Sequence, residues 1–413
     1  MRCPSARLVA LWAGIAGILP PPRALAVEAE GRYRLVSEGA LRVHDPIEPT
    51  RLRARSEVEF RVRQGFTWRG TVAVRAFRDW ALDRSRYSAA AREQQGGEVE
   101  LRELTIGVAV GPLDLVAGRR QVAWGALFGQ FVTDRVMPLD LRDFVLPDAD
   151  FVRRPLWMVS LLAAGERLSA EAVLVLERRA DRLPVAGSEF ALDGAGAVGA
   201  GEEPAGAAEE NDVSRVALGD SEPALRLEGR AGGVDVTAFA LAAHPDLDPT
   251  ATSGELGERD LVVGSTAAVA SGPYALRTEA VLERDRPRAS GGSEDVVRAG
   301  LAVDRALPRA HIVSLQCVHE SVGDGRTEVA LRWSGAPAGG RLVPSVEFHL
   351  GLDGDWLLKP RAAYSIGTAW LAEFGVDGFG GRPDTFYGQF DRRDRVTLTI
   401  SRAGRWATAT SKR

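Results

Sequence analysis

Apolar and polar residues alternate along most of this chain, and the alternation restricts the folds that it can adopt. Segment 57–63 places Val58, Phe60 and Val62 on one side and charged residues on the other. The same pattern recurs in segments 328–333, 346–350 and 396–401. Side chains on a β-strand point to opposite faces in turn, so each segment has one apolar and one polar face. Many segments run about 9 to 12 residues, the length of a tilted transmembrane strand rather than of a soluble one.

The connections between these segments alternate between short and long. Short turns are expected at 64–65, 111–112, 165–166, 232–233, 272–273, 307–308, 336–340 and 366–367. The connections at the other end are mostly longer and more polar, above all at 122–155 and 179–222. Outer-membrane barrels have short periplasmic turns and longer extracellular loops. The pattern therefore predicts an all-β protein, a single transmembrane antiparallel β-barrel of about 18 strands, with 16 as the alternative count. Both termini would lie on the periplasmic side.

One segment breaks the alternation. Val99 and Leu101 fall in one phase, whereas the apolar residues from Leu104 to Val110 fall in the other. One extra residue in a strand shifts the phase in this way, so we expect a β-bulge near Arg102 and Glu103.

The first 26 residues have the features of an export signal. Arg2 and Arg7 precede an apolar run from Leu8 to Leu19, and Ala24-Leu25-Ala26 is a small-residue cleavage site. The apolar run is shorter than the roughly 20 residues that a spanning helix needs, which disfavours an uncleaved anchor. We therefore expect residues 1–26 to be a cleaved signal peptide and residues 27–413 to be the barrel, located in a bacterial outer membrane.

The charge and cysteine content exclude some classes of protein. The chain has 52 basic and 56 acidic residues, a net charge of -4, and loss of the three arginines in 1–26 would make it -7. Such a balance gives no electrostatic footprint for nucleic acid, so no nucleic-acid partner is expected. Cys317 is the single cysteine after the signal, so no intrachain disulfide forms. Closure of a large sheet on itself is another source of stability.

A soluble all-β protein, such as a periplasmic sandwich or propeller, is the alternative fold. Each apolar strand face would then need a second layer to cover it, and the alternation of short and long connections would have no explanation. Aromatic residues near predicted strand ends also fit a membrane barrel, where they form girdles at the interfaces. These residues are Trp68, Trp80, Trp157, Trp333, Trp356, Trp370 and Tyr364.

The two longest connections differ in character. The connection at 179–222 contains a run rich in glycine and alanine, followed by glutamates, and is expected to be a flexible, acidic external loop. It would either capture or shield a ligand, or be a tolerated insertion. The connection near 122–155 is instead dense in charges of both signs, prolines and glycines.

The segment 118–156 carries a resemblance to a known family. Its motif residues are Gly118, Gln121, Trp124, Gly125, Pro138 and Pro155, in a Gly-Arg-Arg-Gln strand end, a Trp-Gly step and an Arg-Arg-Pro step. Over about 40 residues this segment resembles a family of uncharacterised proteobacterial outer-membrane β-barrels labelled as a domain of unknown function, and more distantly the porins of alginate export. Met137 departs from the family, which usually has Asn there. The resemblance implies an integral outer-membrane protein with a channel-like or export-associated role, and no substrate.

The charged residues of this segment suggest how it is used. A loop that folds into a barrel lumen needs polar groups, because the lumen is wet, and charged clusters set the ion selectivity of pores. We expect a salt-bridged inward loop that narrows the pore; the alternative is a structural plug that does not contact solute. The residues concerned are Arg119, Arg120, Asp134, Asp140, Arg142, Asp143 and Arg154.

No catalytic or metal-binding pattern accompanies these features. The chain has no His-x-x-x-His or Cys-x-x-Cys spacing, and Ser345 and His349 are too far apart along a strand to act together. We therefore expect no enzyme activity and no cofactor. The leading functional hypothesis is a porin-like channel or the outer-membrane component of an export route. The alternative is a plugged structural or assembly barrel. Expected partners are outer-membrane lipid, the barrel-assembly machinery and periplasmic export or lipid-handling proteins.

Overall fold

The computed structural model describes residues 27–65, 67–144, 146–147, 149–179, 181–192, 215–216, 219, 221–243, 260–287, 293–323, 325–337 and 340–409. The predicted signal peptide at 1–26 and the glycine- and alanine-rich part of the 179–222 connection lie outside the described residues. Among the described residues, no helix is long and apolar enough to cross a membrane.

Eighteen strands form one sheet. The first seven are β1 (Val27–Arg42), β2 (Pro49–Gln64), β3 (Trp68–Asp79), β4 (Gly97–Val110), β5 (Leu113–Arg120), β6 (Leu156–Ala164) and β7 (Leu168–Val175). The others are β10 (Glu222–Ala231), β11 (Val234–Ala243), β12 (Asp260–Ser271), β13 (Tyr274–Pro287), β14 (Ser293–Leu307), β15 (His311–Glu320), β16 (Arg326–Ser334), β17 (Leu342–Gly351), β18 (Trp356–Ile366), β19 (Trp370–Gly380) and β20 (Arg395–Ala409). The remaining elements are short: η1 (Trp80–Asp83), α2 (Ala89–Gln95), α3 (Ala149–Val152), β8 (Glu177–Arg178), β9 (Arg215–Val216) and η4 (Gly388–Phe390).

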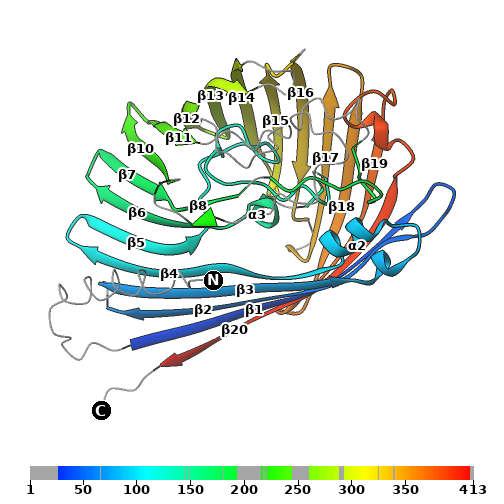
Figure 1. The fold of residues 1–413 in the computed structure, drawn as a ribbon, viewed down its shortest axis with the longest axis horizontal. Helices are drawn as coiled ribbons and strands as arrows, with labels where there is room; N and C mark the ends of the chain where they lie inside the picture. The colour runs from blue at the N-terminus through cyan, green and yellow to red at the C-terminus, as the bar shows by residue number, and fades with distance from the viewer. Residues whose placement is uncertain are drawn as a thin grey trace.

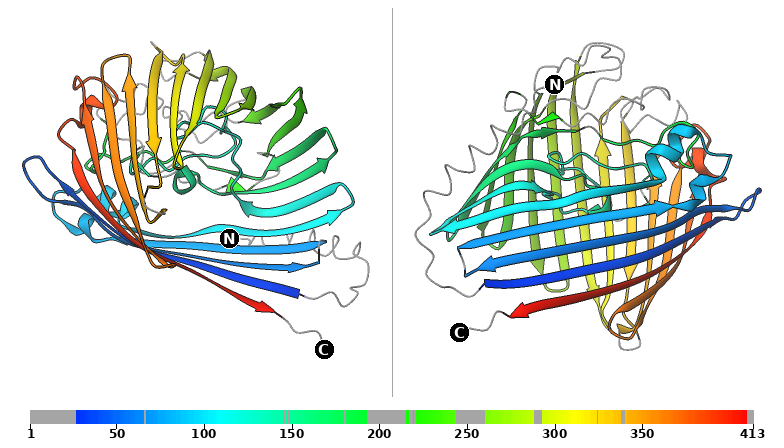
Figure 2. Two further views of the ribbon diagram at one scale, coloured as in Figure 1. Left: turned by 180° about the vertical axis from the view of Figure 1, so that it is seen from behind. Right: turned by 60° about the horizontal axis from the view of Figure 1, so that its bottom comes forward.

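The sheet closes into an antiparallel barrel, as Figures 1 and 2 show. Each strand pairs with its neighbour in sequence, β7 pairs with β10, and β20 pairs with β1 from Glu28 opposite Ala409 to Arg42 opposite Arg395. Closure removes both edges of the sheet, so every strand finds hydrogen-bonding partners on two sides. The predicted count of about 18 strands is confirmed.

The predicted rhythm of the connections is confirmed as well. Tight turns with a glycine of positive φ, such as Gly111 and Gly272, join strands at one end, whereas the connections at the other end include 80–96, 121–155 and 381–394. The bulge lies where it was expected. In the pairing of β3 with β4, Ala73 faces Glu103 and Val74 faces Leu101, so Arg102 is the extra residue.

The outer face of the barrel is apolar. Exposed side chains on this face include Leu35, Phe60, Leu301, Leu331, Phe374 and Leu398. Aromatic residues are also exposed near the short-turn end, among them Tyr274, Tyr364 and Trp370. The predicted girdle is matched in part. Trp80 is exposed at the opposite end, as a second aromatic rim requires. Trp333, by contrast, is half-buried and stacks on His311, with ring centroids 5.6 Å apart. An apolar band with aromatic rims is the outer surface that a lipid bilayer requires.

Candidate functional site: the lumen and its inward loop

Residues 121–155, here called the inward loop, leave the end of β5 and pack inside the ring of strands (Figures 1 and 2). Their apolar side chains lie against the inner face of β6, β7 and β10–β14. The cluster is formed by Val122, Trp124, Leu127, Val132, Val136 and Met137 of the loop with Leu156, Met158, Val173, Val175, Ala224, Phe239, Leu241, Val262, Val281 and Ala302 of the wall. This part of the lumen, here called the packed half, is therefore filled.

The packed half corrects one expectation. A wet lumen was expected, which favours polar side chains on the inner face of the strands, yet β11 turns Phe239 and Leu241 inward, with exposed fractions of 5% and 1%. The reason is that these side chains face the inward loop rather than water. The rings of Trp124 and Phe239 lie 5.1 Å apart. A wall that contacts a folded segment is a hydrophobic core, and apolar residues favour burial there.

Glu279 of β13 holds the tip of the inward loop. Its carboxylate accepts hydrogen bonds from the backbone N–H of Leu127 at 2.8 Å, from the N–H of Thr133 at 3.1 Å and from Thr133 Oγ1 at 2.7 Å. The N–H of Ala126 donates to the same carboxylate. Glu279 is only 2% exposed. Four donors from one loop therefore converge on one buried acceptor, which fixes the loop six strands away from β5.

Polar contacts with β13–β16 extend this anchorage. Gln316 of β15 donates to the backbone carbonyl of Phe128 at 2.7 Å. Gln130 donates to Glu328 of β16 at 2.5 Å, and Arg135 forms an ion pair with Glu283 of β13 at 2.5 Å. The loop is thus tied to the wall by hydrogen bonds on one side and by apolar packing on the other.

The remaining part of the lumen is not filled by the inward loop. A cavity of about 1480 Å³ lies between the loop and the strands β1–β5 and β16–β20. The inward loop bounds it through Asp143, Leu146, Pro147 and Phe151. The cavity lining extends toward the short-turn end, where it includes Arg32, Thr368 and Arg405. We call this region the open half.

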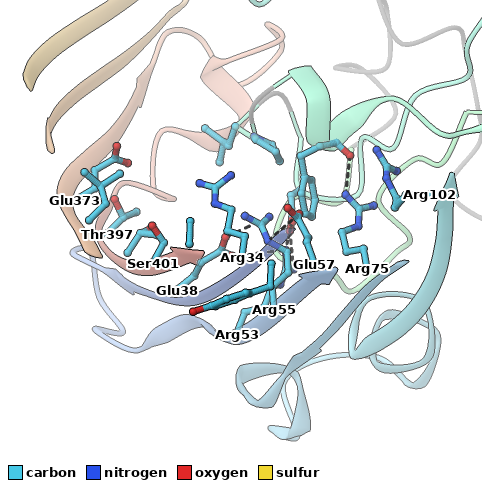
Figure 3. Close-up of a pocket in the computed structure, with 18 of the residues that line it drawn as sticks. Arg34, Glu38, Arg53, Arg55, Glu57, Arg75, Arg102, Glu373, Thr397 and Ser401 are labelled. Carbon is cyan, nitrogen blue, oxygen red and sulfur yellow. Dashed lines mark hydrogen bonds and ion pairs between the residues drawn. The ribbon is translucent and has the colours of Figure 1, made fainter. Parts of the chain in front are cut away.

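The open half is rich in positive charge. Its lining has thirteen basic and eight acidic side chains, a formal charge of +5, although the whole chain carries -4. Arginines extend into the cavity from β1–β4, and hydroxyls of Thr397 and Ser401 lie on the adjoining β20 (Figure 3). Arg34, Arg332 and Arg405 have exposed side chains and no ion-pair partner within 4.0 Å among the described residues. Their charge is available to solute.

The predicted charged residues of the inward-loop segment divide into two groups. Arg120 and Asp143 line the cavity, whereas Arg119, Asp134, Asp140, Arg142 and Arg154 are buried away from it. Several of them have ion-pair partners outside this set of residues. Asp140 pairs with Arg142, but the partners of Arg119, Arg120 and Asp134 are Glu177, Glu171 and Arg153. Most of this charge therefore stabilises the loop rather than the pore wall.

Asp140 and Arg142 show how the buried charges are compensated. Arg142 binds the Asp140 carboxylate with two nitrogens, Nε at 2.8 Å and Nη2 at 2.5 Å, and its Nη2 also contacts Glu98 of β4 at 2.7 Å. Burial acts to raise the pKa of Asp140, but the ion pair and hydrogen bonds with Arg142 outweigh it and hold the pKa below its ordinary value. The pair therefore remains charged and joins the loop to β4.

Asp143 lies at the boundary between loop and cavity. Two arginines of β2 converge on it: Arg53 Nη1 lies 2.6 Å from its Oδ2, and Arg51 forms an ion pair with its Oδ1. Burial acts to raise the pKa of Asp143, but these two guanidinium groups hold it well below its usual range. All three residues line the cavity.

The motif residues position the beginning and end of the loop. Gly118 has φ +137°, and a Cβ there would lie 2.0 Å from the carbonyl oxygen of Leu104, so the position requires glycine. Gln121 donates to the carbonyl of Arg153. The N–H groups of Trp124 and Gly125 donate to Asp134 at 2.6 and 2.9 Å. The carbonyl of Pro138 accepts from Arg154 N–H at 2.9 Å, and Pro155 is buried.

Some residues of the open half were not identified from the sequence. Arg51, Arg53 and Arg55 follow one another at every second position of β2, which is the pattern that would place three guanidinium groups on one face. Arg34 follows Arg32 at the same two-residue spacing in β1, so this pattern could also have placed it on the lumen face. Among the described residues, no group of three or more potential metal ligands is present.

Comparisons with known proteins agree with this geometry. The barrel is similar to the outer membrane protein OpdK of Pseudomonas aeruginosa, with a TM-score of 0.56 and 9% identity over 92% of this chain and 99% of that one. It is similar to OccAB4 of Acinetobacter baumannii, with a TM-score of 0.56 and 10% identity over 94% and 100% of the two chains. OccK5 (OpdH) of Pseudomonas aeruginosa gives 0.56 and 12% over 93% and 98%. At such identities the likeness shows the fold, which is that of Gram-negative outer-membrane porins.

A search of curated proteins gave no match. The more distant likeness to alginate-export porins finds no support in these comparisons. The family model described as "Protein of unknown function (DUF1302)" matches residues 22–302, more than half of the chain, and it bears out the resemblance carried by segment 118–156. The chain therefore belongs to the DUF1302 family, a family of outer-membrane β-barrels of unknown function.

Proposed function

We propose that this protein is an outer-membrane channel through which small anions pass in preference to cations. The observation that carries the proposal is the open half of the lumen, a cavity of about 1480 Å³ whose lining has a formal charge of +5. The remainder of the lumen is filled by the inward loop. Charged side chains that line a narrow aqueous passage set its ion selectivity, because few water molecules screen them there.

The unpaired arginines support the sign of the selectivity. Most basic side chains of the open half are neutralised by a neighbouring carboxylate, as Arg75 is by Glu100 at 2.7 Å. Arg34 and Arg332 have no such partner among the described residues and are exposed to the cavity. Solved structures of this fold include OpdK with vanillate and OccK2 in complex with glucuronate, and both compounds are carboxylates. Small organic carboxylates are therefore the solutes that we propose.

The proposal predicts a selectivity that depends on these arginines. In a planar bilayer with a KCl gradient, the refolded chain should give a reversal potential that is shifted toward the equilibrium potential of chloride. The double variant Arg34→Ala, Arg332→Ala should lower the chloride-to-potassium permeability ratio roughly twofold to fivefold, about 0.4–1 kcal/mol of lost Coulomb attraction. Arg305→Ala is the matched control, because Arg305 lies over Tyr274 at 5.4 Å and does not line the cavity.

A cation-selective wild type, or a double variant indistinguishable from Arg305→Ala, would contradict the proposal. The measured ratio also separates selectivity from assembly, because a variant that inserts and conducts has folded. Heat-modifiable migration on a gel confirms folding for each variant before the currents are compared.

A plugged barrel is the second candidate, and a specific observation favours it. Phe144 and Leu146 of the inward loop pack with Phe190, Phe379 and Phe390 in an aromatic cluster near the long-connection end. Such a cluster would close the lumen and leave an anchor for outer-membrane lipid or for periplasmic export and assembly partners. Absence of current from a correctly folded protein, and from variants that loosen the loop, would favour this function over the channel.

A further inference from the structure

We propose that Arg51 and Arg53 form a subsite for the carboxylate of a permeating anion, and that Asp143 of the inward loop occupies this subsite until solute displaces it. The inference rests on the proposed function, since it requires anions in the open half. It adds a binding site, the chemical class of its ligand and a way in which the ligand controls its own passage.

The geometry at Asp143 is that of a bound carboxylate. Arg53 presents two nitrogens to it, Nη1 at 2.6 Å from Oδ2 and Nη2 at 3.4 Å from Oδ1, and Arg51 Nη2 pairs with Oδ1. A guanidinium group that binds both oxygens of one carboxylate gives the strongest and most specific charge-assisted contact. A spherical chloride ion has no second oxygen to offer, so the site favours carboxylates over halides.

The two arginines are fixed, whereas their ligand belongs to a loop. Arg53 lies where β2 pairs with both β1 and β3, and Arg51 lies opposite Ala40 of β1. Arg53 Nε is also 3.3 Å from Asp79 Oδ2. Asp79 is 2% exposed and accepts hydrogen bonds from the N–H groups of Leu52 and Ala81 at 3.0 and 3.1 Å. Movement of the inward loop would thus leave the arginines in place.

Departure of Asp143 would leave positive charge on Arg51 and Arg53 that another anion could neutralise. The two guanidinium groups would then keep only the carboxylates of Asp79 and Glu38 within 4.0 Å among the described residues, and Arg53 is only 5% exposed. A buried charge that loses its partner is strongly unfavourable. The carboxylate of a solute would make the same contacts with the two guanidinium groups. The free-energy cost of the exchange is therefore small, and its extent depends on solute concentration. The positive lining of the cavity concentrates anions at this point.

Displacement of Asp143 would act on the boundary of the cavity. The next residue, Phe144, has a left-handed backbone with φ +57°, a conformation that costs energy for a residue with a side chain. Packing of its ring against Phe390 and Phe386, at 4.6 and 4.9 Å, offsets that cost. Asp143 and Phe144 therefore hold the same stretch by two means, and the charge contact is the one with which an anion competes.

The test is the open probability of single channels at increasing sodium acetate, with chloride adjusted to keep the ionic strength constant. Wild type should open more often as acetate rises, severalfold and with saturation. Asp143→Asn should open as often without acetate as wild type does with it, and should not respond further. Asp114→Asn is the matched control, because Asp114 pairs with Arg69 at 2.6 Å outside the cavity lining, and it should behave as wild type.

Asp143→Ser provides the same test if the asparagine variant does not fold. An open probability that is independent of acetate in wild type, or equal in wild type and both Asp143 variants, would overturn the inference. Anion selectivity would survive that result, so the proposed function would stand. A chain that conducts no current in any variant, or that prefers cations, would overturn both.

Discussion

Replacement of Glu279 with alanine is expected to release the inward loop and to raise the single-channel conductance roughly twofold, because the packed half would become accessible to ions. Glu279 accepts three backbone N–H groups and one hydroxyl from the loop, and alanine would leave all four donors without that acceptor. A buried donor without a partner costs about 1–3 kcal/mol. The loop tip would therefore leave the wall of β13.

Two measurements detect the release of the inward loop. Conductance reports the width of the passage, and limited trypsin digestion with mass spectrometry reports cleavage after Arg135, which the folded loop protects. Glu228→Ala is a suitable control, because Glu228 is half exposed and pairs with Arg226 at 3.0 Å. Conductance and protection equal to those of the control would show that Glu279 does not hold the loop.

The substitution Gly118→Val is expected to prevent assembly of the barrel. The new Cβ would lie 2.0 Å from the carbonyl oxygen of Leu104, and the φ of +137° is strained for any residue with a side chain. Neither conflict is relieved by a change of rotamer, because the obstacle is the backbone of β4. We expect the variant to stay unfolded in a refolding experiment, so that heating does not change its migration on a gel.

Gly39→Ala is the matched control for this prediction. Gly39 also lies in a strand, but its backbone is not left-handed and the nearest atom to a new Cβ is the carbonyl oxygen of Leu398 at 3.9 Å. This variant should refold as wild type does. A Gly118→Val barrel that migrates and conducts normally would mean that β4 and β5 adapt to the side chain.

The barrel could be predicted from the sequence because lipid imposes a simple rule on every strand. One face of each strand must be apolar, and the chain meets that rule in segments such as 57–63 and 396–401. The bulge at Arg102 was visible for the same reason, as a change of phase. The two ends of the barrel could be told apart because the turns at one end are short and require residues such as Gly111 and Gly272.

The interior was harder to predict because its partners are distant in sequence. The charges of the inward loop were identified, but not that Glu279, 152 residues away from Leu127, would bind its backbone. Backbone N–H groups have no signature in the sequence. The apolar part of the inner face of β11 was also missed, because that face changes from Thr237 to Phe239 and Leu241 where it contacts the inward loop, and the sequence does not mark this contact.

The most direct measurement is the effect of a negatively charged thiol reagent on the conductance of two cysteine variants, each also carrying Cys317→Ser. Thr399→Cys places the thiol in the lining of the open half, and Thr237→Cys places it on the inner face of the packed half, where Thr237 is 7% exposed. If ions pass through the open half, a sulfonate reagent should reduce the current through the Thr399 variant and leave the Thr237 variant unchanged. Equal block of both variants, or block of the Thr237 variant alone, would contradict a passage that runs along the arginines of β1–β4.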